Sequence, residues 1–410
     1  NISFFDETSE FDYSDGCIQM GFSSQCIINN NTILTTSNDI CIYLFSCTNS
    51  TISSNHIETN YGSAIILDGS SNNSIIKNKV VKNDYGIYLQ NSHDNIIQDN
   101  FILDNYRYGI AIRYSTSNII NTNNLINNFH GGILISHSSD ITVYDNQISN
   151  GFHSSLFLDS ASQIYIINNS FPEIGGINLY YSVSISLLGN SFHSEGIIIT
   201  GDLKEHWNTH KIERNDINGA PIKYYSNTHD FSVSEHAAQV ILANTTNVKI
   251  QGLQTNNIRR PLQIGFSSQN TIDKNSFLLC YGCGLYLSNS DKNIISNNIL
   301  TGEESVAIEL YYCMNNLIRY NSFSNNFMGV LLHLSEENII EKNNFQSNVI
   351  QAECEFRSPR IYIFHTNKWN QNYWDDWIGV KYTFLHFLPY RINWLNFDWR
   401  PSSESYDIDD

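Results

Sequence analysis

GIYLQNSHDNIIQDNFILDNYRY, residues 86–108, is followed directly by GIAIRYSTSNIINTNNLINNFHG, residues 109–131. Both segments are 23 residues long and both begin with glycine. Each also has an asparagine fourteen residues after that glycine, at Asn100 and Asn123. A repeat this short and regular is typical of a solenoid, in which each repeat packs only against its neighbours.

The start of this repeat, a small residue followed by apolar residues at the second and fourth positions, recurs along the whole chain. We find sixteen copies, mostly 22 or 23 residues apart. The copies begin at residues 17, 41, 64, 86, 109, 132, 155, 176, 196, 221, 239, 261, 284, 307, 329 and 351. This periodicity indicates one long array of repeats and not a set of independent domains.

The apolar pattern inside each copy indicates short strands. Apolar residues alternate with other residues, as at Ile87 and Leu89, and no window keeps the spacing of an amphipathic helix. A leucine-rich repeat has a similar length, but its leucine frame is missing. The sequence therefore predicts an all-β fold, a single-stranded right-handed parallel β-helix of the pectate-lyase-like kind, with about 16 coils of 22–23 residues.

The ends of the array indicate how the chain is divided. Five of the six Trp fall in the last 42 residues, at Trp369, Trp374, Trp377, Trp394 and Trp399. An aromatic tail of this kind would cover the open edge of the last coil. We predict a β-helix over residues 1–366, with loop insertions at about 200–260, and a Trp-rich capping segment over residues 367–410.

The recurring asparagine predicts a structural ladder. Its amide can donate to and accept from identical amides one coil above and below, and asparagine tolerates the left-handed conformation of a sharp corner. The predicted ladder consists of Asn55, Asn78, Asn100, Asn123, Asn146, Asn169, Asn190, Asn275, Asn298, Asn321 and Asn343, preceded by Asn31, with Asn215, Asn256 and Asn367 in the same role after small insertions. We expect each of these asparagines to hold a corner.

Composition limits the partners and the location. The net charge of −18 would repel a polyanion, so nucleic acid is not expected as a partner. No apolar run is long enough for a transmembrane helix. Six Asn-x-Ser/Thr sequons suit an extracellular or cell-surface protein, and we predict glycosylation at Asn1, Asn30, Asn49, Asn72, Asn168 and Asn244.

The eight cysteines do not predict a metal site. They are Cys17, Cys26, Cys41, Cys47, Cys280, Cys283, Cys313 and Cys354. Cys280 and Cys283 have the spacing of a zinc ligand pair, but no second pair lies at zinc-finger distance. We favour buried thiols or one or two local disulfides, and we predict no metal and no cofactor.

The coil GIYLQNSHDNIIQDNFI (residues 86–102) and the runs NKWNQNYWDDW (367–377) and FDWRPSSESYDI (397–408) resemble NosD-like, or CASH-type, right-handed β-helix proteins. Such proteins are abundant among exported archaeal and bacterial surface proteins, and the resemblance covers nearly all of the chain from about residue 17. It implies the fold but not an activity, because the superfamily includes carbohydrate-binding modules, lyases, epimerases and plain surface proteins. The NosD name implies copper, but three Met and no ordered His cluster predict no copper site here.

In enzymes of this architecture, the outward side chains of the first sheet carry the acids and bases. The third positions of the sixteen copies form this column, and only Lys223, Glu309 and Glu353 among them are charged. In the next column, Asp68, Arg113 and Asp159 are each two coils apart, about 10 Å, which is too far for one concerted site. The column of third positions instead carries an apolar, partly aromatic stripe from Tyr43 through Tyr88 to Phe157. This stripe predicts a contact surface unless another segment covers it.

The period breaks once, between residues 200 and 260. This stretch contains His206, Trp207, His210, His229, Asp230, Glu235 and His236, which we treat as candidates for binding or catalysis. His206 and His210 have the spacing of a metal pair on a helix, but the sequence predicts no helix there and no third ligand. A polar surface loop without function explains this stretch better than a catalytic site.

Two functions fit these patterns. The first is a non-enzymatic extracellular β-helix protein of the cell surface, structural or adhesive, with other subunits in a homo-oligomer or filament, or surface glycans, as partners. The alternative is a polysaccharide-acting enzyme, a lyase, epimerase or hydrolase, with its site in the 200–260 stretch. The absence of an acid–base pair in the outward column favours the first.

Overall fold

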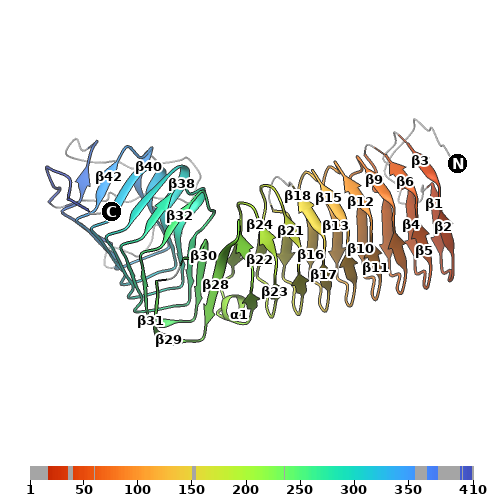
Figure 1. The fold of residues 1–410 in the computed structure, drawn as a ribbon, viewed down its shortest axis with the longest axis horizontal. Coiled ribbons are helices and arrows are strands. Elements are labelled where there is room, and N and C mark those ends of the chain that lie inside the picture. The colour runs from red at the N-terminus through yellow and green to blue at the C-terminus, as the bar shows by residue number, and fades with distance from the viewer. Residues whose placement is uncertain are drawn as a thin grey trace, which may run out of the picture. The chain divides into compact units, whose positions relative to one another are not determined.

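The structure is a computed structural model that describes residues 17–35, 40–59, 61–149, 154–234, 236–355, 367–376, 398 and 400–408. By its internal contacts the chain forms two compact units, unit 1 over Asn1–Gly219 and unit 2 over Ala220–Asp410. In both units the described chain winds into coils of short parallel strands (Figure 1). The predicted parallel β-helix is therefore confirmed.

Unit 1 contains three parallel sheets, each with nine strands among its described residues. The first sheet consists of β1 (Ile18–Gly21), β4 (Ile42–Phe45), β7 (Ile65–Asp68), β10 (Ile87–Gln90), β13 (Tyr108–Arg113), β16 (Gly131–Ser136), β19 (Leu156–Asp159), β22 (Ile177–Tyr180) and β25 (Ile197–Thr200). The second sheet consists of β2 (Ile27–Asn29), β5 (Thr51–Ser53), β8 (Ser74–Ile76), β11 (Ile96–Gln98), β14 (Ile119–Asn121), β17 (Thr142–Tyr144), β20 (Tyr165–Ile167), β23 (Ser186–Leu188) and β26 (Lys211–Glu213). The third sheet consists of β3 (Thr32–Leu34), β6 (His56–Glu58), β9 (Lys79–Val81), β12 (Phe101–Leu103), β15 (Asn124–Ile126), β18 (Gln147–Ser149), β21 (Ser170–Phe171), β24 (Ser191–Phe192) and β27 (Asp216–Ile217).

Unit 2 repeats the arrangement. Its first sheet consists of β28 (Ala220–Ser226), β30 (Gln239–Ala243), β33 (Leu262–Gly265), β36 (Gly282–Ser288), β38 (Ile299–Tyr311), β40 (Ser322–His333) and β43 (Ile350–Glu355). The second consists of β29 (His229–Val233), β31 (Thr246–Gln251), β34 (Thr271–Asp273), β37 (Ile294–Ser296), β39 (Leu317–Arg319), β41 (Ile339–Glu341) and β44 (Lys368–Asn370). The third consists of β32 (Gln254–Asn256), β35 (Ser276–Leu278), the first residues of β38 and β40, β42 (Asn344–Gln346) and β45 (Tyr373–Trp374).

The strands stack in register because equivalent positions of the repeat face one another. Ile87 pairs with Ile65 in the preceding coil and with Ile110 in the following one. In the copy that begins at residue 86 the second and fourth positions, Ile87 and Leu89, point inward and are both fully buried. The core of each unit is thus a set of stacked Ile, Leu, Val and Phe columns, which removes a large apolar area from water.

Each coil turns at left-handed residues, and the residue after each turn is usually buried and often polar. In the coil that begins at residue 86 the left-handed residues are Asn91, Asp94, Asp99 and Asp104, with φ of 48°, 56°, 56° and 54°. The buried residues that follow them are Ser92, Asn95, Asn100 and Asn105, and each backbone N–H donates to the side-chain oxygen of the equivalent residue in the next coil. The corners therefore carry four hydrogen-bonded files.

The predicted ladder is the third of these files. Asn100 donates through its backbone N–H (3.0 Å) and its Nδ2 (2.9 Å) to Asn123 Oδ1, and its own Oδ1 accepts the same two bonds from Asn78. The asparagines of this file run from Asn31 to Asn215 in unit 1 and from Asn275 to Asn372 in unit 2. The expectation that these asparagines are themselves left-handed is wrong, because the residue before each one, such as Asp99, makes the turn.

Two assignments near the insertions are also wrong. Asn256 lies exposed on β32, and the third file passes through Leu253, whose N–H donates to Asn275 Oδ1. Asn367 accepts from Asn338 and so belongs to the second file. The third file passes instead through Asn372, five residues later. Fourteen residues is a reliable spacing only where the coil has no insertion or deletion before the corner.

The end of the third file in unit 2 is an aspartate. The carboxylate of Asp398 accepts from the backbone N–H groups of Gln371 (2.9 Å) and Asn372 (2.8 Å), from Asn372 Nδ2 (2.9 Å) and from Trp374 Nε1 (3.1 Å). A carboxylate suits this position because the last amide of the ladder needs an acceptor and no further donor. Residues 368–374 extend the sheets by strands β44 and β45, and Trp374 stacks on Phe345 at 4.2 Å. Trp377, Trp394 and Trp399 lie outside the described residues.

Candidate functional site

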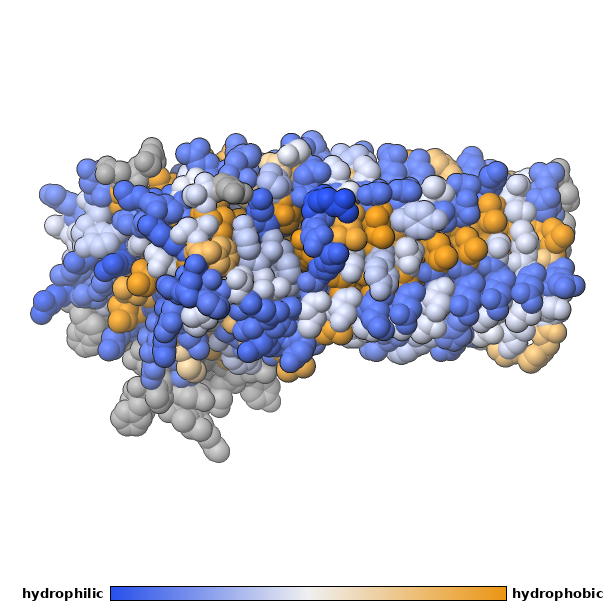
Figure 2. Space-filling view, turned by 60° about the horizontal axis from the view of Figure 1, so that its bottom comes forward, coloured by the Kyte–Doolittle hydropathy of each residue, from blue (hydrophilic) through white to orange (hydrophobic). Residues whose placement is uncertain are grey.

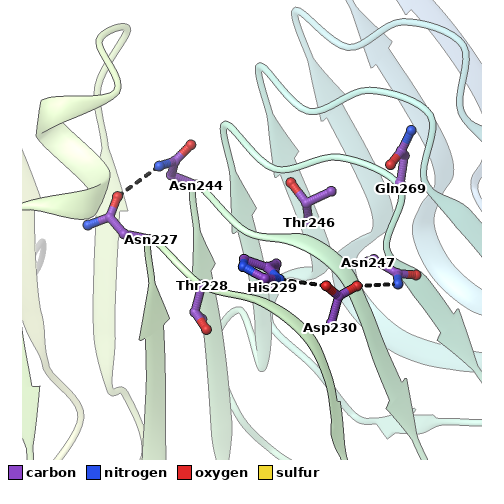
Figure 3. A pocket seen from close by; sticks show the side chains of 8 residues that line it. All are labelled: Asn227, Thr228, His229, Asp230, Asn244, Thr246, Asn247 and Gln269. Carbon is purple, nitrogen blue, oxygen red and sulfur yellow. Dashed lines mark hydrogen bonds and ion pairs between the residues drawn. The ribbon is translucent and has the colours of Figure 1, made fainter.

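A polar hollow opens at the corner between the first and second sheets of unit 2, with a volume of about 730 Å³. Its lining consists of Asn227, Thr228, His229, Asp230, Asn244, Thr246, Asn247 and Gln269. Figure 3 shows His229 and Asn247 directed at Asp230, and Asn244 directed at Asn227. Asp230 accepts from Asn247 Nδ2 at 2.6 Å and pairs with His229 Nδ1 at 2.5 Å, and Asn244 Nδ2 donates to Asn227 Oδ1 at 2.8 Å.

The hollow lies where one coil is unusually short. Ile222 on β28 pairs with Gln239 on β30, only 17 residues later in the chain, whereas Ile87 and Ile110 are 23 residues apart. Among the described residues between β29 and β30, the short coil has no third strand. Asn227, Asp230, Asn244 and Asn247 are left-handed corner residues. Because a left-handed residue at a corner turns its side chain away from the core, the polar groups gather on the surface.

The carboxylate of Asp230 stays ionised at neutral pH. The hydrogen bond from Asn247 has the largest effect, and together with the bond from His229 it holds the pKa of this exposed carboxyl below its usual value. The hollow therefore offers one fixed negative charge surrounded by amide, hydroxyl and imidazole groups. It has no second carboxylate among its lining residues, and a glycoside hydrolase of the usual kind needs two.

The structure divides the candidates of the 200–260 stretch. His206, Trp207 and His210 belong to unit 1, whereas His229, Asp230 and His236 belong to unit 2. Of these, His229 and Asp230 line the hollow, and His236 is exposed outside it. Glu235 lies outside the described residues. The predicted insertion is also shorter than expected, because residues 220–226, 229–233 and 239–243 are regular strands.

His210 and Trp207 are structural, and their assignment to a surface site is wrong. A short helix, α1 (Glu205–Asn208), forms where the sequence predicted none, and Trp207 on it is fully buried with Nε1 donating to Gly201 O at 3.0 Å. The ring of His210 is buried in a corner file, where Nδ1 accepts from the N–H of Ile185 at 3.3 Å and Nε2 lies 2.8 Å from His206 O. Burial lowers the pKa of His210 to about 4, so the imidazole is neutral.

The stripe predicted on unit 1 is half-buried. Tyr43, Tyr88 and Phe157 point outward from β4, β10 and β19 and keep part of their surface in solvent, but Ala111 and Leu134 between them are buried. We call Tyr43, Ile66, Tyr88, Ala111, Leu134 and Phe157 the outward row, since they pair in register on the first sheet. Apolar side chains form a band between polar ones along this unit in Figure 2.

Aromatic contacts widen the outward row at Tyr43, Tyr88 and Phe157. Phe45 lies 6.5 Å from Tyr43, Tyr85 stacks on Tyr88 at 5.3 Å, and Phe157 stacks on Tyr180 at 6.0 Å between ring centroids. Polar side chains stand beside the row on the same strands, in the register Asp68, Gln90, Arg113, Ser136 and Asp159. Tyr88 donates its hydroxyl to Gln90 at 2.6 Å. The face thus combines ring surfaces with hydrogen-bonding groups.

Glu309 on the first sheet of unit 2 has charged neighbours that the sequence did not bring together with it. The guanidinium of Arg260 lies 4.1 Å above the ring of Tyr286, and His333 pairs with Glu355 at 2.5 Å. Burial raises the pKa of Glu309, while Arg260 and His333 lower it in part. The outward column contains Tyr286 and Glu309, but Arg260, His333 and Glu355 lie at other positions of the repeat. A scan of one column could not find them.

The eight cysteines are all free thiols. Cys41, Cys47, Cys280, Cys283, Cys313 and Cys354 are buried, and Cys17 and Cys26 are half-buried. Cys47 and Cys313 lie in the first corner file, the one that contains Ser92. The N–H of Cys47 donates to Ser70 Oγ, and the N–H of Cys313 donates to Ser335 Oγ. Within the described ranges no three His, Cys, Asp or Glu side chains form a metal-binding group.

The sequons occupy a recurring corner pattern. Five of the six sequon asparagines are left-handed corner residues: Asn30, Asn49, Asn72, Asn168 and Asn244. In each of these five sequons the Ser or Thr is the first residue of a strand. Asn1 lies outside the described residues. Asn30, Asn49, Asn72 and Asn168 are exposed, whereas Asn244 is half-buried. Glycosylation at these positions stays a prediction.

The parallel coils define the class of right-handed parallel β-helix proteins, and residues 4–92 match the right-handed β-helix region. Residues 64–229 and 224–379 match the family described as periplasmic copper-binding protein (NosD). The chain therefore belongs to the NosD family. The donor set of the described residues does not fit a copper site of three or more ligands, so copper is not carried over to this chain. The described part of the chain also contains no helix with the length and apolar character needed to cross a membrane.

Solved structures show similar folds at low identity. The DFA-IIIase from Arthrobacter chlorophenolicus A6 without its lid is 13% identical with a TM-score of 0.36, over 62% of this chain and 64% of the enzyme. A double mutant of the periplasmic alginate epimerase AlgG is 13% identical with a TM-score of 0.30, over 73% of each chain. The comparison with curated proteins found no match.

Proposed function

We propose that this protein is a non-enzymatic β-helix scaffold, extracellular or periplasmic, that contacts glycan chains through the outward row of unit 1. The observation that supports it most is the row itself. Tyr43, Tyr88 and Phe157 present partly exposed rings on one sheet face, beside a polar column that begins at Asp68. Sugar rings stack on aromatic faces while their hydroxyl groups bond to polar side chains, so this pairing suits a glycan.

The spacing of the acids argues against cleavage at this face. Asp68 and Asp159 are four strands apart in the register, which is about 19 Å at the usual spacing of parallel strands. Paired catalytic carboxylates of glycosidases are at most about 9.5 Å apart. The alternative enzyme with a site at residues 200–260 also loses His210, which is buried and neutral. The scaffold is therefore the better supported function.

A binding assay with variants tests the proposal. Affinity for a panel of neutral and acidic polysaccharides is measured for the wild type and for Tyr43→Ala with Tyr88→Ala. Each lost stacking contact is worth about 1 kcal/mol, so the double variant is expected to bind about tenfold or more weakly. Tyr165→Ala is the matched control, because Tyr165 is an exposed tyrosine on the second sheet.

Two results would overturn the proposal. The first is an affinity of the double variant equal to that of the wild type, with circular dichroism showing that both are folded. The second is the release of shorter or unsaturated sugars from any polysaccharide of the panel by the wild type. Assembly into a homo-oligomer or filament stays a separate prediction, which light scattering at high protein concentration tests.

A further inference from the structure

The hollow of unit 2 has the chemistry of a small hydroxyl-rich ligand. Its eight lining side chains are amides, hydroxyls, one imidazole and one carboxylate, and none is apolar. Water fills such a surface readily, so only a ligand that replaces several hydrogen bonds at once gains from entering it. Figure 3 shows that these groups come from neighbouring coils, with one contact between Asn227 and Asn244 and another group centred on Asp230.

Asp230 and Asn247 form the central pair. Asn247 donates to one carboxylate oxygen of Asp230 and His229 bonds to the other, which fixes the carboxylate before any ligand arrives. Each carboxylate oxygen has a second acceptor site, and the amide of Asn247 keeps one further N–H and its carbonyl oxygen. The pair therefore places an acceptor and a donor side by side, which is the complement of two neighbouring hydroxyl groups.

The charge of the hollow selects among sugars. The carboxylate of Asp230 is exposed and ionised, and the whole chain carries a net charge of −18, so a uronate or sulfated sugar is repelled. A calcium ion prefers six to eight oxygen ligands with several carboxylates, and the hollow offers a single carboxylate. A neutral sugar is the ligand that fits both the hydrogen-bonding groups and the charge.

We propose that the hollow binds a neutral sugar residue with two adjacent hydroxyl groups, held by Asp230 and Asn247. This inference rests on the proposed glycan-contacting function, but it involves different side chains in a different unit. The hollow contains no aromatic ring for stacking other than the imidazole of His229, so a single sugar binds weakly, with a Kd of about 1 mM. A glycan with several such residues gains affinity by binding more than once.

Saturation-transfer NMR with methyl mannoside and methyl galactoside tests the inference. The wild type is expected to give a signal that Asp230→Asn reduces at least tenfold, because the amide keeps the shape but loses the charge and one acceptor. Asp273→Asn is the matched control, since Asp273 accepts from Asn297 Nδ2 at 2.8 Å on the second sheet but lies outside the hollow. Both variants keep an Asx side chain, so neither is expected to disturb the fold.

The outcomes separate this inference from the proposed function. Three results would each refute the sugar site. The first is an unchanged signal in Asp230→Asn, and the second is binding of methyl glucuronide equal to that of the neutral glycosides. The third is displacement of the sugar by about 1 mM calcium, a concentration on the order of the Kd expected for the sugar. A signal that persists in the Tyr43→Ala, Tyr88→Ala variant, while polysaccharide binding is lost, supports both proposals. A wild type that binds the methyl glycosides in the hollow but no polysaccharide on unit 1 would remove the proposed function and keep the sugar site.

Discussion

His210 gives unit 1 a defined sensitivity to acid. Its Nδ1 accepts the N–H of Ile185, so the proton of the neutral ring is on Nε2, which donates to His206 O. A second proton on Nδ1 would point at the N–H of Ile185 and break that bond. Burial lowers the pKa of His210 from an unfolded value of about 6.5 to about 4.

The sign and size follow from proton binding in the two states. Between pH 6.5 and pH 4 the unfolded chain binds a proton that the folded chain excludes, so the free energy of unfolding falls as the pH falls through this window. At about 1.4 kcal/mol per pH unit, His210 alone removes about 3 kcal/mol between neutral pH and pH 4. Below pH 4 its contribution is constant.

His210→Asn removes this sensitivity and keeps the corner. An asparagine at this position would accept from Ile185 through Oδ1, as Asn95 accepts from Asn73 in the same file. We expect the variant to be about 1–2 kcal/mol less stable than the wild type at pH 7.5, because the bond to His206 and some packing are lost. At pH 4 this order is expected to reverse.

Urea denaturation followed by circular dichroism at pH 7.5, 5.5 and 4 measures the effect. The difference in the free energy of unfolding between variant and wild type is expected to change by about 3 kcal/mol across this range. His193→Asn is the control, because the side chain of His193 is exposed in the same unit. If the His210→Asn difference is the same at pH 7.5 and pH 4, the buried neutral imidazole is not the cause of the acid sensitivity and the reasoning fails.

Three further predictions follow from the files and the thiols. Asn100→Ala leaves the N–H and Nδ2 of Asn78 without their acceptor, so it is expected to lower the free energy of unfolding, measured by urea denaturation, by about 3 kcal/mol. The control is Asn91→Gly at an exposed left-handed corner, which is expected to change this free energy by less than about 0.5 kcal/mol. Asp398→Ala removes the acceptor of five N–H groups, four of them in residues 371–374, and is expected to increase hydrogen exchange over residues 368–374 at least tenfold. Unchanged protection there would contradict the role of Asp398 at the end of the ladder. In a thiol titration, Cys17 and Cys26 are expected to react first in the folded protein, because burial raises the pKa of Cys280 and Cys313 to about 12, and eight thiols are expected after denaturation. Fewer than eight reactive thiols in the unfolded, unreduced chain would show a disulfide that the structure lacks.

The sequence by itself determined the coil, its register and the third file. Apolar residues with period two, repeated every 22 or 23 residues, leave stacked strands as the arrangement that buries them, and the pairing of Ile87 with Ile65 and Ile110 follows from that. The Asn78 to Asn123 stretch of the ladder could be found for the same reason, because identical amides are the partners that satisfy one another.

The tertiary structure alone decided which side chains the break in the period brings together. The coil after β28 is 17 residues long, and its pairing with the next coil brings Asp230 beside Asn247, which no fixed spacing in the sequence indicates. The sequence also did not show that His210 and Trp207 are buried, because their polar or amphipathic side chains suggested a surface position. Trp207 is buried on a four-residue helix, and His210 is buried just after it. Side-chain type limits what a residue can bond to, but burial and neighbours from distant coils determine which of those bonds it makes.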